Sequence, residues 1–189
     1  MQHFNLRILL LLIVLVTFDI CRAQTINPNW KQDLNTSLDK FLKCNTSASE
    51  SACSGYVGES LYTVYRLKDF QSVKTGKYMT VNEIAAFLKD SDKWTPIGRA
   101  YEQKALEQAQ QESNNKKAVA ALYLNSAGIG HVVLIVPGEL QSSGSWGLKV
   151  PNSTSFLLSE PGKSYSEKPL SFALGKNLMK DIIIYTRKY

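Results

Sequence analysis

The chain has 189 residues, of which 44% are hydrophobic and 20% are charged, and its formal net charge is +6. This composition is typical of a globular protein and too apolar for a disordered chain. One domain is expected at this length, which leaves no room for a doubly wound cofactor domain beside a separate substrate domain. The sequence contains no HExxH, GxSxG, GxxxxGK or GxGxxG pattern, so four common classes of enzyme lack their signature.

The first 23 residues have the pattern of a signal peptide. Arg7 precedes an unbroken apolar run over residues 8–16, and Cys21 and Ala23 place small residues where a signal peptidase cleaves. The run is too short to span a bilayer, which takes about 20 apolar residues. We therefore expect cleavage after Ala23, a single domain over residues 24–189, and a secreted or periplasmic protein without a membrane anchor.

The residue pattern in the first half of the mature chain predicts helices. Apolar residues recur at helical spacing over residues 29–44, and a second helix is expected to begin near Ala52 with Ser51 as its N-cap. Residues 80–83 form a capping-box pattern that opens a short helix through Leu88. A longer polar helix is expected over residues 98–112.

The second half changes to β-rich patterning. Apolar runs over residues 118–124 and 129–136 are separated by Asn125-Ser126-Ala127-Gly128, which is typical of a hairpin. Further short strands are expected at residues 148–150, 155–158 and 182–186. Helices followed by strands indicate an α+β domain in which N-terminal helices pack on an antiparallel sheet.

Two residues stand out as candidates for chemistry. Cys53 is expected at the start of a helix, where the positive end of the helix dipole favours a thiolate. His131 lies in the most apolar strand and follows Gly130, which leaves room for another group to approach closely. After loss of the signal peptide the chain keeps one His and two Cys, too few for a structural zinc site.

Each candidate also has a purely structural interpretation. His131 could be a buried, hydrogen-bonded and inert side chain. Cys44 and Cys53 could form a disulfide, as two cysteines in an exported protein usually do. The bond would close a ten-residue loop and contribute about 2–3 kcal/mol on the chain-entropy model.

Four local sequences stand out. Residues 51–57 (SACSGYV) open a predicted helix, and the apolar residues 118–122 are followed by a Gly-His strand at residues 130–138 (GHVVLIVPG). These resemble the nucleophile motif, the preceding strand and the strand that supplies the catalytic base in the papain-like NlpC and CHAP families of peptidoglycan hydrolases. Residues 146–151 look like the next strand. The resemblance covers roughly residues 50–158.

The resemblance implies a papain-like cysteine peptidase or amidase that acts on peptidoglycan stem peptides and needs no metal or organic cofactor. It assigns Cys53 as nucleophile and His131 as base. A third residue from the following strand would orient the imidazole, and Asn152 is favoured over Ser155 because its amide is the better acceptor for a ring N–H.

Muropeptides are therefore the expected substrate, and the resemblance also allows an inhibitor or immunity protein as a partner. The isoelectric point near 9.2 suits attraction to anionic cell-wall polymer. Lysines and aromatic residues do not cluster as a nucleic-acid groove requires, so no nucleic acid is expected.

The alternative function is that of an inactive, disulfide-clamped binding or inhibitor domain. A third interpretation combines both: the protein is a hydrolase that a reversible Cys44–Cys53 disulfide inactivates.

Overall fold

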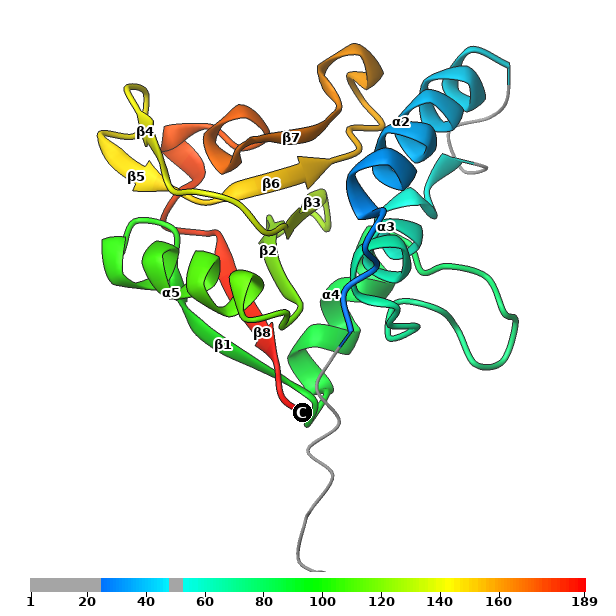
Figure 1. The fold of residues 1–189 in the computed structure, drawn as a ribbon, viewed down its shortest axis with the longest axis horizontal. Helices are drawn as coiled ribbons and strands as arrows, with labels where there is room; N and C mark the ends of the chain where they lie inside the picture. Colours follow the sequence, from blue (N-terminus) through cyan, green and yellow to red (C-terminus); the bar gives the residue numbers. More distant parts are fainter. Residues whose placement is uncertain (1–24, 48–52) are drawn as a thin grey trace, which may run out of the picture.

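The computed structural model describes residues 25–47 and 53–189 (Figure 1). The predicted signal peptide and the proposed N-cap Ser51 lie outside the described residues. Besides three short 3-10 helices (Pro161–Lys163, Leu170–Phe172 and Lys176–Leu178), the described part of the chain forms four α-helices, a six-stranded sheet and a two-stranded hairpin. In order they are α2 (Trp30–Ser47), α3 (Tyr56–Tyr65), α4 (Val81–Asp90), β1 (Trp94–Arg99), α5 (Gln103–Asn114), β2 (Val119–Leu124), β3 (Gly130–Ile135), β4 (Gln141–Ser143), β5 (Leu148–Val150), β6 (Asn152–Ser155), β7 (Tyr165–Pro169) and β8 (Ile183–Arg187). None of these helices is both long and apolar enough to cross a membrane.

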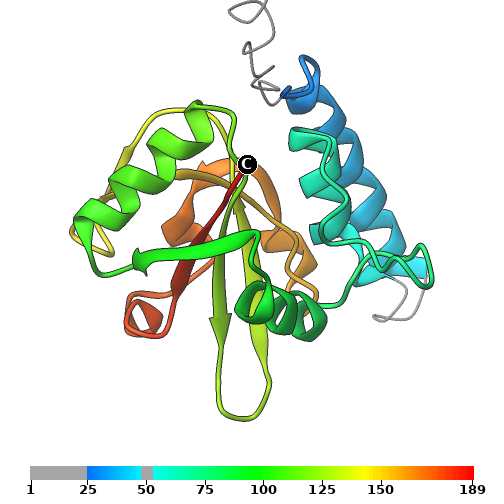
Figure 2. The same ribbon diagram turned by 90° about the horizontal axis from the view of Figure 1, so that it is seen from below.

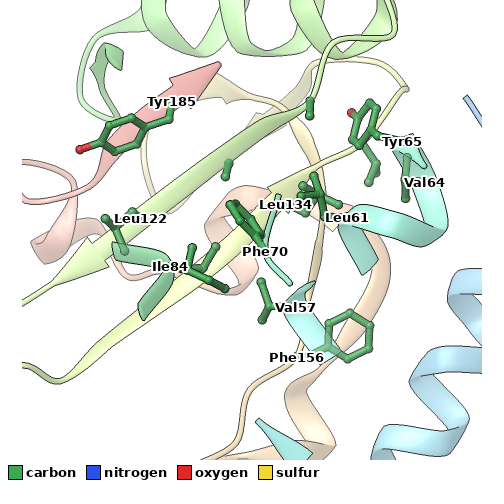
Figure 3. Close-up of a cluster of buried hydrophobic side chains, with 14 of the residues drawn as sticks. Val57, Leu61, Val64, Tyr65, Phe70, Ile84, Leu122, Leu134, Phe156 and Tyr185 are labelled. Atoms are coloured by element: carbon green, nitrogen blue, oxygen red, sulfur yellow. The ribbon is translucent and has the colours of Figure 1, made fainter. Parts of the chain in front are cut away.

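The sheet separates two layers of helices. Its strand order is β1-β8-β2-β3-β6-β7 and every neighbouring pair is antiparallel, so the expected α+β class with an antiparallel sheet is confirmed. One face packs on the N-terminal helices through a cluster that includes Val57, Leu61 and Leu134 (Figure 3). The other face packs under α5, on the opposite side of the sheet from α2 and α3 (Figure 2).

Several predicted elements agree with the structure. The helix expected over residues 29–44 is α2, and the capping box is present at the start of α4, where Thr80 and Glu83 exchange side-chain and backbone hydrogen bonds. These bonds also lower the pKa of Glu83. The predicted hairpin is β2–β3, whose turn is held by the Asn125 side chain, an acceptor for two backbone N–H groups.

Other predictions were displaced by tertiary pairing. The helix expected from Gly98 begins at Gln103, because residues 94–99 form the edge strand β1 against the C-terminal β8. Pro96 is tolerated there since an edge strand need not donate every N–H. Gly98 has a φ of +147° beside an irregularity in the register, which suits glycine.

Two further corrections concern the candidate residues directly. α3 begins at Tyr56 with Gly55 as its N-cap, so Cys53 lies in the turn before the helix rather than in its first turn. The strand expected over residues 155–158 is β6, three residues earlier. Its polar sequence does not look like a buried strand. It is one because Ser153 and Thr154 find hydrogen-bond partners on β7.

Candidate functional site

A cavity of about 480 Å³ lies where the first residues of α3 and α4 meet the turn end of the β2–β3 hairpin. Both candidate residues of the sequence analysis, Cys53 and His131, line this cavity. Its walls come from the turn into α3, the first residues of α4, the turn end of the β2–β3 hairpin, the segment that follows β6, and residues 173–178 between β7 and β8. Sequence elements separated by more than 70 residues thus converge on one site.

Cys53 enters this site as half of a disulfide. Its sulfur is bonded to that of Cys44, near the end of α2, and the two Cα atoms are 6.0 Å apart. Only 1% of the Cys53 surface is exposed, and the residue belongs to the core cluster beneath α3. A sulfur in a disulfide is not a nucleophile, so in this redox state Cys53 cannot attack a substrate.

His131 occupies the second position of β3 and lines the cavity. Its Nε2 is 2.7 Å from Oγ of Ser155 on β6. Burial disfavours the charged imidazolium and lowers the pKa of His131 to about 4. The ring is therefore neutral near pH 7 and has a nitrogen able to accept a proton.

Of the two candidates for the orienting residue, Ser155 and not Asn152 contacts His131. Asn152 begins β6, and its side-chain amide donates to the carbonyl oxygen of Pro137 at 3.1 Å. Its backbone N–H donates to Oε1 of Gln110 at 2.8 Å. Asn152 therefore belongs to a buried polar network at the other end of the strand. The amide is the better acceptor, but strand register, not acceptor strength, decides which side chain reaches the ring.

The two candidates approach the cavity from different sides of the sheet. Alternation along β3 puts His131 on the same face as Val133 and Ile135, which pack in the α5 layer. Cys53 packs in the layer of α3. The cavity can join the two sides because β3 pairs with β6 only at Leu134 and Ile135, so the start of β3 and the chain after β6 diverge.

Gly130 has a more specific role than the sequence suggested. A Cβ atom at this position would collide with the carbonyl oxygen of Tyr123 and the side chain of Leu124 on the paired strand. The group that approaches closely is therefore the neighbouring strand β2. Gly130 allows the hairpin to remain tightly paired up to the residue next to His131.

Sequence reasoning did not find the other side chains of the cavity. Thr80 and Asn82 come from the start of α4. Tyr56 and Phe156 line the cavity with stacked rings, and the buried Phe41 packs edge-on against both. The capping box located the start of α4 in the chain, yet no local signal could place that helix end beside His131. Among the described residues, no three His, Cys, Asp or Glu side chains gather as metal ligands do.

Comparison with known proteins adds no family assignment. No family model matches the chain, and no curated protein sequence matches it significantly. The fold and site therefore define an α+β protein with a cysteine–histidine cavity, and the disulfide at Cys53 is the feature that any function must accommodate.

Proposed function

We propose that this chain is an exported, papain-like cysteine hydrolase that cleaves amide bonds in peptidoglycan stem peptides, and that the Cys44–Cys53 disulfide holds it inactive. The observation that carries the proposal is that Cys53 and His131 line one cavity while Ser155 contacts the imidazole. A nucleophile before a helix, a base on the next hairpin and an orienting residue on the following strand form the arrangement expected of an activated cysteine.

Activation requires reduction of the disulfide. A dithiol of the thioredoxin class would transfer two electrons to the Cys44–Cys53 bond, become a disulfide itself, and leave two free thiols on this chain. The fold does not depend on the bond alone at this point. Phe41 of α2 packs against Tyr56 of α3 and against Phe156, with ring centroids 5.3 and 5.4 Å apart. This aromatic cluster keeps α2 against α3 after reduction.

The reaction then follows from the chemistry of the pair. His131 accepts the proton of the Cys53 thiol as the sulfur attacks the amide carbonyl, and it returns this proton to the leaving amine as the C–N bond breaks. A thioester remains on Cys53. Water loses a proton to His131, attacks the thioester and releases the acid and the thiol. Ser155 acts as a positioning residue that fixes the imidazole.

The decisive experiment compares single-cysteine variants of the secreted protein on purified peptidoglycan. With a dithiol reductant, the wild type should release muropeptides, whereas Cys53→Ala and His131→Ala should lose at least about 10³-fold in rate, as expected when a nucleophile or its base is removed. Cys44→Ser is the matched control, because it should be active without reductant. Release of muropeptides by Cys53→Ala at the wild-type rate would contradict this mechanism.

A second function is favoured by one specific observation. Cys53 is almost fully buried, and its partner Cys44 packs against the same core, as in a permanent structural bond. The chain would then be a secreted binding or inhibitor domain with no turnover. Alkylation of the purified protein at about pH 6 without reductant, followed by mass spectrometry, locates any free thiol. Inactivity of Cys44→Ser, together with unchanged binding to peptidoglycan, would favour the binding domain.

A further inference from the structure

A second cavity continues from the first along the length of α4. It measures about 570 Å³ and lies between α4 and the sheet, beside β2 and β8. Asn82 and Gly128 line both cavities, so the two meet at the first turn of α4 and the tip of the hairpin. Together they form a groove that begins at Cys53 and His131 and ends near Asp90, at the far end of the helix.

Charge is distributed unevenly along this groove. None of the described residues that line the first cavity is charged at neutral pH, since His131 is neutral there. The charged side chains of the groove, Lys89, Asp90 and Asp181, all line the second cavity. Transferring an ionised group from water to a site without a partner costs several kcal/mol, so the end near Cys53 and His131 disfavours charged ligands.

The backbone of β3 adds a preference for an extended peptide over other apolar ligands. On its β6 side, β3 forms ladder pairs only at Leu134 and Ile135. Gly130 lines the cavity, and its backbone N–H and C=O point to this side of β3, whereas those of His131 face Tyr123 of β2. Unpaired strand edges present N–H and C=O groups that another extended chain can satisfy. An acyl chain or an aromatic ring would leave these groups without partners.

We infer that the groove binds an extended peptide whose residues next to Cys53 and His131 carry uncharged side chains. The inference rests on the proposed function and specifies its substrate. In a stem peptide the alanine residues meet the requirement at the reacting end. Carboxylate- or amine-bearing residues would lie further along, toward Lys89, Asp90 and Asp181.

Binding to the oxidised protein tests this inference without any catalysis. The probes are acetyl-tetraalanine amide and its analogues with Glu or Lys at the second residue, measured by isothermal titration calorimetry. We expect each charged analogue to bind at least tenfold more weakly than the neutral peptide. Equal affinity for neutral and charged peptides, or no binding of the neutral peptide, would overturn the inference.

A variant of the second cavity tests whether the groove is continuous. Ala86 is exposed and lines only the distal part, so Ala86→Trp should fill it without disturbing the core. We expect at least tenfold weaker binding of acetyl-tetraalanine amide, while Gln111→Trp, an exposed change on α5, keeps the wild-type affinity. Unchanged affinity of Ala86→Trp contradicts a continuous groove. Peptide binding as expected, with no hydrolysis after reduction, would leave this inference standing and remove the proposed function instead.

Discussion

The two ends of the short strand β6 use buried polar side chains for different purposes. At one end Asn152 is enclosed by Pro137 and Gln110, each within hydrogen-bond distance, and serves the packing of α5 on the sheet. At the other end Ser155 contacts His131, which lines an open cavity. Both side chains are buried and polar, so burial and residue type alone cannot separate a structural role from a functional one. What separates them is whether the partner reaches a cavity.

The largest effect we expect comes from His131 at the open end. Its folded pKa of about 4 lies below the ordinary value of 6.5, so the unfolded chain binds the extra proton between these values. Stability from this group is therefore complete above pH 6.5 and is lost as the pH falls toward 4, by about 3 kcal/mol.

Urea unfolding of the oxidised protein at pH 7 and pH 4 measures this loss. His131→Gln is the control, because carboxylates titrate in the same range in both proteins and only the histidine contribution disappears. The wild type should lose about 3 kcal/mol more than His131→Gln between the two pH values. Equal losses would mean that His131 is solvated and protonates freely.

At the Asn152 end of β6, Asn152→Ala should lower the free energy of unfolding and leave the catalytic rate unchanged. The substitution leaves the partly buried carbonyl of Pro137 without its donor, which costs about 2 kcal/mol in the free energy of unfolding. Asn115→Ala, an exposed change at the end of α5, should stay within about 0.5 kcal/mol of the wild type. The rate of muropeptide release by folded, reduced Asn152→Ala should equal that of the wild type. A selective loss of rate would return Asn152 to the site.

Ser155→Ala should have the opposite effect, because it lowers the catalytic rate. Loss of the contact with Nε2 lets the imidazole adopt other orientations, so kcat of the reduced protein should fall about tenfold, equivalent to about 1.4 kcal/mol, while KM stays constant. Ser142→Ala, on the exposed hairpin strand β4, is the matched control. A rise in KM with unchanged kcat would instead place Ser155 in substrate binding.

Local sequence signals were sufficient where an element depends on its own residues. The capping box at Thr80 and Glu83 opens α4, and the turn at Asn125 joins β2 to β3, because both are held by hydrogen bonds between residues at most four apart. Apolar spacing likewise predicted α2. Local motifs were also sufficient to identify Cys53 and His131 as candidate site residues, and both line one cavity.

Only the tertiary structure decided the remaining features, because each depends on partners distant in the chain. β1 is a strand since β8, more than 80 residues later, pairs with it. β6 is buried despite its polar sequence since β7 satisfies its hydroxyl groups. The register between β3 and β6 brings Ser155, rather than Asn152, to His131. A shift by one residue would turn every side chain of β6 to the opposite face, and no local pattern fixes that register.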